Sequence, residues 1–222
     1  TQSIFWNSYA IGAGIEYEAA RLKPKIDPVL GLEEETNTYL NYFGKVEMDS
    51  YDNTNYPTKG IKFDAQVKLI TSQGKEPVAF IVGRLNNAFS ISKKFTYINH
   101  IYGGTADGNE IPYQYMFYTG GLNPSVRNGF LPFVGMDFME KVNNNALIWG
   151  GDLQYEIFPN VYTIIKGNIG NLTDDFSKLL NTDNLLGGYG ITLGYDSFIG
   201  PIEVSASKAF NENGILGFVN IG

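Results

Sequence analysis

Residues 186–196, LGGYGITLGYD, alternate between two kinds of side chain. Tyr189, Ile191, Leu193 and Tyr195 fall at every second position, and glycine, threonine or aspartate fall between them. Because successive side chains of a β-strand point to opposite faces, we predict a strand with one apolar face and one face of small polar groups. In a soluble sheet the apolar face would cover a core, whereas in a membrane β-barrel it would meet lipid.

The same alternation recurs along most of the chain. It is clearest at 61–70, where the apolar residues Ile61, Phe63, Ala65, Val67 and Leu69 alternate with Lys62, Asp64, Gln66 and Lys68. Further extended segments are predicted at 9–20, 38–49, 78–92, 95–102, 151–158, 161–170, 201–210 and 214–222. Few apolar segments remain to cover so many apolar faces. The pattern favours an all-β, antiparallel transmembrane β-barrel of about ten strands, and a soluble β-sandwich binding module is the alternative.

Composition limits the other classes of protein. The mean hydropathy of −0.14 is typical of a soluble protein, but alternation hides the apolar face of a barrel from such an average. No apolar run approaches the roughly 18 residues that a transmembrane helix requires. The net charge of −7 argues against nucleic acid as a partner, because nucleic acid selects basic surfaces. The absence of cysteine removes disulfides and thiolate metal sites.

The sequence carries no recognisable catalytic motif. The Gly-x-Ser-x-Gly turn of many serine hydrolases is absent. The one histidine, His100, has no neighbouring partner in the sequence, so we expect a structural or lumen residue. Glu16 and Glu18 share a strand face. Neither has a partner acid that the sequence places at a defined distance across a substrate site, so glycosidase chemistry is not predicted. We therefore expect no catalytic residue, no metal site and no cofactor in this chain.

Residues 103–146 form the longest irregular region. They contain Gly-Gly pairs, three prolines and three consecutive asparagines. Loops of this length are usually functional, so we predict a long lumen-facing or extracellular loop within the barrel domain.

Part of this region, 113–135, reads YQYMFYTGGLNPSVRNGFLPFVG and resembles the lumen loop of the bacterial surface-antigen superfamily. That superfamily contains outer-membrane insertases and two-partner-secretion translocators, and its loop carries an aromatic run, Gly-Gly and then Val-Arg-Gly-aromatic. The matching residues here are Gly120, Gly121, Val126, Arg127, Gly129 and Phe130. Asn128 is inserted between Arg127 and Gly129. Further likenesses are the turn 56–60, the start of the strand at 200–202 and the ending 217–222.

Three segments look most like the barrels of patatin-like phospholipases in that superfamily. They are 155–158, 187–195 and 200–203. The resemblance implies that 1–222 is an outer-membrane barrel domain, incomplete at both ends, that supplies about the last ten strands of a sixteen-stranded barrel. Periplasmic domains and any lipase domain would then lie upstream.

The resemblance also implies a function. The chain would anchor an upstream patatin-like phospholipase domain in the outer membrane of a Gram-negative-type bacterium, with translocation of that domain as a second role. Whether the full-length parent is an enzyme stays open, because a lipase dyad would lie outside this chain. The alternative within the superfamily is an insertase or secretion-pore barrel. Expected partners are outer-membrane lipid, upstream domains of the same polypeptide, and other outer-membrane proteins or a second copy.

In the family, the loop arginine folds into the barrel and pairs with acidic residues of the inner wall. Arg127 would take that part here, and Glu156 is the candidate partner on the polar face of its strand. Asn168 stands where the next strand usually offers an aspartate. The alternative is that Arg127 is an ordinary surface-loop residue.

Overall fold

The computed structural model describes residues 2–5, 9–22, 35–122, 129–183 and 185–222. Eleven strands form one sheet in which every neighbouring pair is antiparallel. In spatial order they are β1 (Gln2–Phe5), β2 (Tyr9–Leu22), β3 (Glu35–Asp49), β4 (Gly60–Thr71), β5 (Val78–Ser90), β6 (Phe95–Asp107), β10 (Asn145–Phe158), β11 (Val161–Thr173), β12 (Leu186–Ser197), β13 (Gly200–Ala209) and β14 (Leu216–Ile221).

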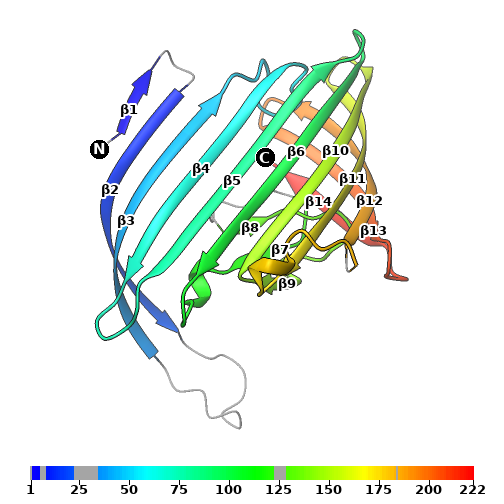
Figure 1. Ribbon diagram of the computed structural model, residues 1–222. Coiled ribbons are helices and arrows are strands. Elements are labelled where there is room, and N and C mark those ends of the chain that lie inside the picture. Colours follow the sequence, from blue (N-terminus) through cyan, green and yellow to red (C-terminus); the bar gives the residue numbers. More distant parts are fainter. Residues whose placement is uncertain (1, 6–8, 23–34, 123–128, 184) are drawn as a thin grey trace.

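The sheet curls into a barrel wall, with β1 and β14 as its two edge strands (Figure 1). The predicted all-β, antiparallel architecture is confirmed, and β1 is a strand that the alternation did not predict. Within the described ranges, no helix has the length and apolar character needed to cross a bilayer. Among the described residues the helical turns are two short 3-10 segments, η2 (Tyr113–Tyr115) and η3 (Phe176–Lys178).

The two ends of the wall differ in the length of their connections. At the short-turn end, uppermost in Figure 1, strands are joined by residues 50–59, 91–94, 159–160 and 198–199. At the long-connection end, strands are joined by residues 72–77, 108–144, 174–185 and 210–215. Bacterial outer-membrane barrels have short turns on the periplasmic side and longer loops outside, so this asymmetry gives the wall an orientation.

The two faces of the wall follow the predicted alternation. Among the residues expected to face lipid, Ile15, Val67, Ile165, Leu193 and Val204 are 67%, 51%, 57%, 58% and 57% exposed. Their neighbours in sequence point to the concave side. No described segment covers these outer side chains, and the outer face is therefore the surface that the barrel interpretation assigns to lipid.

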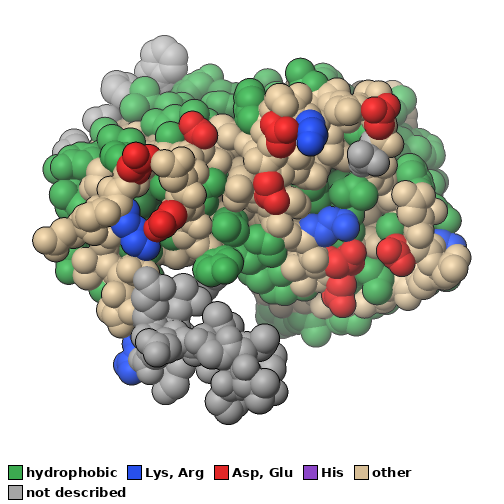
Figure 2. Space-filling view, turned by 60° about the horizontal axis from the view of Figure 1, so that its bottom comes forward, with side chains coloured by type: hydrophobic (Ala, Val, Ile, Leu, Met, Phe, Trp, Pro, Cys, Tyr) green, Lys and Arg blue, Asp and Glu red, His purple; other side chains and the backbone are tan. Residues whose placement is uncertain are grey.

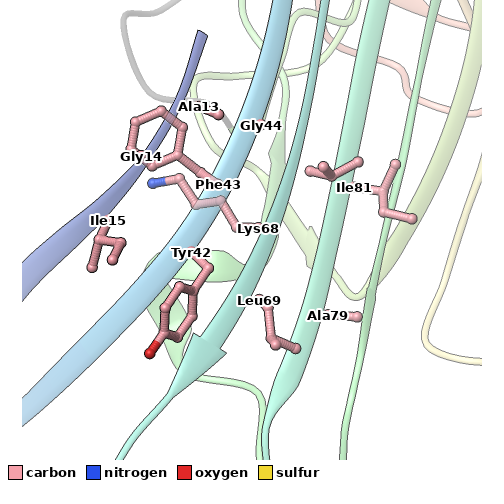
Figure 3. A pocket seen from close by; sticks show the side chains of 11 residues that line it. Ala13, Gly14, Ile15, Tyr42, Phe43, Gly44, Lys68, Leu69, Ala79 and Ile81 are labelled. Atoms are coloured by element: carbon pink, nitrogen blue, oxygen red, sulfur yellow. The ribbon is translucent and has the colours of Figure 1, made fainter. Parts of the chain in front are cut away.

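A shallow depression of about 580 Å³ lies on the outer side of β2 to β5. Figure 3 shows Ile15, Tyr42, Leu69 and Ile81 around Gly44, where a side chain is missing from the outer surface. The lining is mostly apolar, so the depression is continuous with the lipid-facing surface and is not a polar ligand site.

The predicted irregular region 103–146 is shorter than expected and is partly ordered. Strand β6 continues to Asp107 and β10 begins at Asn145, so the connection covers 108–144. The Gly-Gly pair that suggested a loop lies within β6, where Gly104 makes room for an aromatic ring: a Cβ there would lie 2.3 Å from the ring of Phe117. The connection also contains the strands of a second sheet, β7 (Phe117–Thr119), β8 (Phe130–Leu131) and β9 (Lys141–Asn143).

The described residues 113–122 and 129–136, here called the inner segment, pack against the concave side of the wall. Phe117 stacks on Phe80 of β5 with ring centroids 5.2 Å apart, and Phe117 and Phe133 are fully buried. The resulting apolar core comprises Tyr39, Ile70, Val78, Phe80, Val82, Ala106, Tyr115, Phe117, Leu131, Phe133, Met136, Ala146 and Ile148. The wall therefore has an apolar inner surface under this segment as well as an apolar outer face.

The long-connection end is predominantly acidic. Figure 2 views this end and shows acidic side chains scattered over it, with fewer basic ones. The acidic residues of its described connections are Glu76, Glu110, Asp137, Glu140, Asp174, Asp175, Asp183 and Glu212, against Lys75, Lys141 and Lys178.

Candidate functional site

The inner wall encloses a polar cavity of about 340 Å³, here called the lumen cavity. Its lining comes from the strands β4, β5, β6, β10, β11 and β13, from the inner segment and from the turn 50–59. Seven of the lining residues carry acidic or basic side chains: Lys62, Asp64, Arg84, His100, Asp152, Lys166 and Glu203. The cavity is therefore bounded at one end by the inner segment and at the other by the turn.

Asp152 of β10 is the centre of the charged cluster on the wall. Its Oδ2 atom lies 2.8 Å from Nζ of Lys166 on β11 and 3.2 Å from Nε2 of His100 on β6. The residue is only 7% exposed. A buried carboxylate is tolerated when cations and hydrogen bonds compensate its lost hydration, and the Lys166 ammonium and the His100 ring from the two neighbouring strands are placed to do so here.

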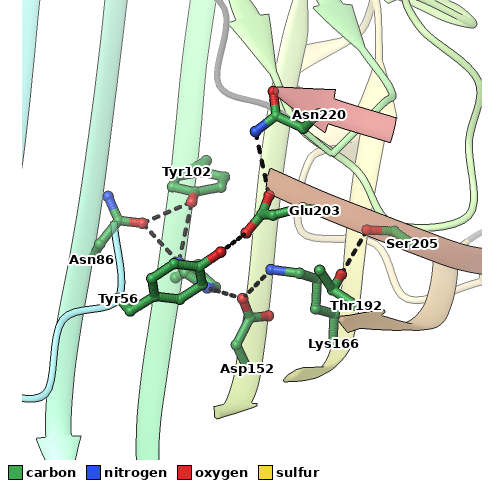
Figure 4. A network of polar contacts seen from close by, with 10 residues as sticks. Tyr56, Asn86, Tyr102, Asp152, Lys166, Thr192, Glu203, Ser205 and Asn220 are labelled. Carbon is green, nitrogen blue, oxygen red and sulfur yellow. Dashed lines mark hydrogen bonds and ion pairs between the residues drawn. The ribbon is translucent and has the colours of Figure 1, made fainter. Parts of the chain in front are cut away.

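Hydrogen bonds extend this cluster across the wall (Figure 4). Nδ1 of His100 lies 2.7 Å from the Oδ1 atom of Asn86 on β5, and the hydroxyl of Tyr102 donates to the same oxygen at 2.7 Å. The hydroxyls of Thr192 and Ser205 are 2.8 Å apart on β12 and β13. Polar side chains thus link the walls of the cavity, which fixes their positions more than it stabilises the barrel.

A second ion pair ties the wall to the inner segment. Nη1 of Arg84 lies 3.0 Å from Oδ2 of Asp64, and Nη2 of Arg84 donates to the backbone carbonyl of Phe130 at 3.3 Å. Phe130 is 1% exposed and belongs to β8. Arg84 therefore supports the inner segment from β5.

A third polar cluster holds the start of the inner segment against β2 and β3. The hydroxyl of Tyr115 donates to a carboxylate oxygen of Glu18 and accepts a hydrogen bond from the Asn41 amide at 2.6 Å. On the same face, Nζ of Lys68 lies 2.9 Å from Oε2 of Glu16. Burial and the neighbouring Glu18 carboxylate raise the pKa of the Tyr115 phenol, so the phenol stays a neutral donor.

The turn 50–59 crosses the lumen to the far wall. The ring of Tyr56 is 1% exposed and stacks on Tyr162 of β11 with centroids 4.2 Å apart. Its hydroxyl donates to Glu203 of β13 at 3.2 Å (Figure 4). Gly194 on β12 leaves room for this ring, because a Cβ there would lie 2.4 Å from the Tyr56 hydroxyl.

Side-chain amides add further hydrogen bonds between the turn 50–59 and the far wall. Asn53 and Asn55 donate to the two carboxylate oxygens of Asp196 at 3.3 and 3.0 Å, and Gln154 donates to the carbonyl of Pro57 at 3.4 Å. Within the turn, burial opposes ionisation of Asp52, but hydrogen bonds from Thr58 and the neighbouring backbone outweigh it and lower the pKa of that carboxyl. The turn is therefore an ordered element that closes part of the short-turn mouth.

Four of the six residues of the predicted loop motif lie within the described residues. Gly120 and Gly121 follow β7 with φ of 134° and 74°, and the backbone N–H of Gly120 donates to Leu131 at 3.2 Å. Gly129 and Phe130 are buried, and the carbonyl of Gly129 accepts from Tyr118. The glycines thus shape the inner segment. Val126 and Arg127 lie outside the described residues.

The structure separates the two predicted partners of Arg127. Glu156 faces Tyr162 in the β10–β11 ladder, whereas Asn168 faces Gly150, six positions further along β10. At about 3.4 Å per residue this separation is roughly 20 Å. Asn168 is 9% exposed, lines the lumen cavity and has no hydrogen-bond partner on its Oδ1 atom. A single arginine side chain cannot bind both residues.

The sequence analysis missed the residues at the centre of the site. His100 was expected to be a structural or lumen residue, and it lines the lumen cavity, but its partner Asp152 on β10 was not foreseen. The alternation places Asp152 and Lys166 on the polar faces of the predicted strands 151–158 and 161–170, but it does not pair them. The short connection between the two predicted strands indicates that they are neighbours, but the exact pairing depends on a bulge between Glu156 and Phe158 that the sequence does not reveal.

Groups of three or more His, Cys, Asp or Glu side chains suited to a metal ion do not occur in the described part of the chain.

Comparisons with known proteins agree with this architecture. A family model described as the OMP85 superfamily matches residues 1–222. The crystal structure of BamA from Haemophilus ducreyi lacking POTRA domains 1-3 is similar, with a TM-score of 0.71 and 13% sequence identity. The match covers 96% of this chain and 52% of that BamA chain, so this chain spans about half the length of the structure that it resembles. A search of curated protein sequences found no match.

Identity at this level shows the fold alone, but the family model covers the whole chain. The alternation, the curled antiparallel sheet and the folded-in connection are all accounted for by one family, and the chain belongs to the OMP85 superfamily as an outer-membrane β-barrel.

Proposed function

We propose that this chain is the membrane anchor of an upstream patatin-like phospholipase domain. The observation that carries the proposal is the obstructed lumen. The inner segment fills one part of it through a buried aromatic core, and the turn 50–59 crosses the opposite mouth through Tyr56. An anchor needs only a stable wall in lipid, whereas a constitutively open pore needs a free passage.

The sequence likeness of segments 155–158, 187–195 and 200–203 to patatin-like phospholipase barrels supports the same choice. In this arrangement the hydrolytic residues belong to the upstream domain, and the barrel holds that domain at the outer membrane of a Gram-negative-type bacterium. Translocation of the domain would require the turn and the inner segment to move.

The second candidate is an insertase or secretion-pore barrel. Its support is the likeness to the BamA barrel over 96% of this chain. Such a barrel would act on other outer-membrane proteins, and it would carry periplasmic repeats instead of a lipase upstream.

The native protein from a detergent-solubilised membrane fraction decides between these candidates. Its intact mass and N-terminal peptide map should show a species much heavier than 24.6 kDa with an upstream Gly-x-Ser-x-Gly peptide. Upstream repeats without that peptide would favour the insertase or secretion pore. A detergent-dependent species of about the mass of this chain would remove the lipase proposal, and recovery in the soluble fraction would contradict membrane insertion.

We further propose that Arg127 binds one inner-wall partner and that this partner is Asn168. The Oδ1 atom of Asn168 has no hydrogen-bond partner among the described residues, and Asn168 lines the lumen cavity. Glu156 lies roughly 20 Å away along the wall. Double-mutant cycles of Arg127→Ala with Asn168→Leu and with Glu156→Gln test this choice. A coupling energy of about 0.5 kcal/mol or more is expected for Asn168 alone. Coupling to Glu156 alone would reverse the assignment, and no coupling to either would make Arg127 an ordinary loop residue.

A further inference from the structure

Three lysines at the short-turn end have no carboxylate partner in the described structure. Lys59 lies in the turn 50–59, and Lys93 and Lys94 lie in the turn 91–94. All three side chains are exposed. By contrast, seven other described basic residues form ion pairs with acids: Lys45, Lys62, Lys68, Lys75, Arg84, Lys166 and Lys178. Lys141 and Lys208, towards the other end, also have no ion pair in the described structure, so what sets the three lysines of the short-turn end apart is that they share two adjacent turns.

Hydrogen bonds hold the two turns side by side. Oγ of Ser90 donates to the carbonyl of Thr58 at 2.8 Å, which brings the residue next to Lys59 against the end of β5. The backbone N–H of Ile91 donates to Phe95 at 2.8 Å and closes the turn 91–94. The three lysines therefore lie on one ordered rim and not on independent loops.

The rim also touches the neighbouring hairpin. Nζ of Lys94 lies 3.3 Å from the carbonyl of Ile157 and 5.9 Å from the centre of the Tyr155 ring. The ring of Phe95 packs on Tyr155 with centroids 4.5 Å apart. Lys94 is thus positioned beside an aromatic pair on the outer face, with its ammonium group at the end of the strands.

Below the lysines the outer surface is aromatic and apolar. Phe89 is 51% exposed, Ile91 65%, Phe95 39% and Phe158 66%. In membrane β-barrels, aromatic residues form girdles where acyl chains meet headgroups. Cations directly beyond such a girdle lie at the depth of the lipid phosphates.

We propose that Lys59, Lys93 and Lys94 form a binding surface for an anionic phospholipid of the periplasmic leaflet. The phosphate of the headgroup would bind at the lysines, and the acyl chains would lie on Phe89, Phe95 and Phe158. The occupant is assigned by charge complementarity: this rim carries three unpaired cations in a chain of net charge −7. A basic cluster next to an apolar surface is a typical anionic-lipid site, and each lysine adds to the attraction.

The acids of the same rim have partners other than these three lysines. Asp49 at the end of β3 lies 3.4 Å from Lys62, and Asp196 accepts hydrogen bonds from Asn53 and Asn55. Asp52 is the one acid within these two turns, and its oxygens accept hydrogen bonds from Thr58 and from the backbone of Lys59. Glu156 at the end of β10 lies on the inner face, opposite to the side on which the phenylalanines are exposed. The two turns together therefore keep a positive charge toward the lipid.

Native mass spectrometry of the full-length protein in an uncharged detergent tests the proposal. Phosphatidylglycerol and phosphatidylethanolamine with identical acyl chains are titrated, and the ratio of the two apparent affinities is measured. We expect a preference for phosphatidylglycerol on the order of tenfold, since each surface lysine contributes up to about fivefold. The preference should decrease as ionic strength rises, and excess inorganic phosphate should not abolish it, because phosphate lacks the acyl chains.

Two matched variants locate the site. K59Q/K93Q/K94Q should reduce the preference to less than about twofold, whereas K75Q/K141Q/K178Q, which removes three charges from the long-connection end, should leave it unchanged. Equal affinities in the unmodified protein, or an equal loss in both variants, would overturn the proposal. Complete displacement by inorganic phosphate would indicate an anion site without a lipid.

A second measurement needs no substitution. A phosphatidylglycerol with a photoactivatable headgroup should label peptides that contain 58–60 or 91–95 in reconstituted protein. Labelling confined to the long-connection end would contradict the proposal.

Discussion

The rings of Tyr56 and Tyr162 stack with their centroids 4.2 Å apart and their planes 10° from parallel, although one lies in a turn and the other on a strand across the lumen. Few contacts of this structure do as much to define the lumen. The stack places the Tyr56 hydroxyl within hydrogen-bonding distance of Glu203 and fixes the turn over the short-turn mouth. This stack, together with the amide contacts of Asn53, Asn55 and Gln154, holds the turn that bounds the lumen cavity on this side.

Replacement of Tyr56 by alanine should loosen the turn and open the mouth. The loss of a buried aromatic ring is expected to lower the free energy of unfolding by about 3 kcal/mol or more. Single-channel conductance in planar bilayers should rise at the same time. Tyr56→Phe is the control, because it keeps the stack and removes one hydrogen bond worth about 1 kcal/mol. An alanine variant with unchanged stability and conductance would show that the turn does not close the lumen.

The phenol of Tyr56 should also make stability depend on alkaline pH. Burial and the nearby Glu203 carboxylate raise the pKa of Tyr56 above the ordinary value of about 10. The folded state keeps a proton that the unfolded chain loses, so the stabilising contribution is fully present below about pH 10 and declines as the pH rises towards the folded pKa. Unfolding free energies measured from about pH 9 to pH 12 should fall more steeply for the unmodified protein than for Tyr56→Phe. Parallel curves would contradict this assignment.

Adjacent positions on β4 should respond in opposite ways to the same substitution. Val67 is 51% exposed on the outer face, and Val67→Arg should destabilise the folded barrel in lipid by about 2–4 kcal/mol near mid-membrane depth. Gln66→Arg places the same side chain on the lumen side and should have a small effect. Unfolding titrations in lipid vesicles provide the measurement. Equal tolerance at the two positions would contradict the assignment of the faces.

Removal of one member of the central ion pair should cost more than removal of both. Asp152→Leu leaves Lys166 buried without its carboxylate, and we expect a destabilisation of about 3–5 kcal/mol. The double variant D152L/K166L should recover most of this loss, because no uncompensated charge remains. A fully additive double-mutant cycle would mean that the pair is solvated and contributes little.

Much of the wall could be predicted from the alternation alone. The face assignments at 9–20, 38–49 and 61–70 hold, because each strand has one apolar and one polar side and the period of two is unambiguous there. The alternation fails where the wall is apolar on both faces. Residues of β5 and β6 such as Phe80 and Ala106 contact the inner segment, so their pattern resembles a buried core strand and not a barrel strand.

The lumen site could not be assembled from sequence for a geometric reason. A bulge between Glu156 and Phe158 shifts the β10–β11 register by one residue, and only with that shift does Asp152 face Lys166. The two-residue turn would otherwise pair Asp152 with Gly167. The contacts of Tyr56 depend on the curvature of the whole wall, which no local pattern encodes. Glycines at 104 and 194 are visible in the sequence, but their roles appear only once the opposing rings are placed.

The crossing turn also has a consequence for the order of assembly. Asn53 and Tyr56 find their partners 143 and 147 positions further along the chain, at Asp196 and Glu203. The entropic cost of closing so long a loop means that these contacts form only after the hairpin of β12 and β13 has docked. Before that step, the ring of Tyr56 and the amides of Asn53 and Asn55 lack these partners. The turn 50–59 is therefore expected to become protected only in the completely folded sheet. The rate at which it gains protection from proteases or from hydrogen exchange would measure the last step of folding.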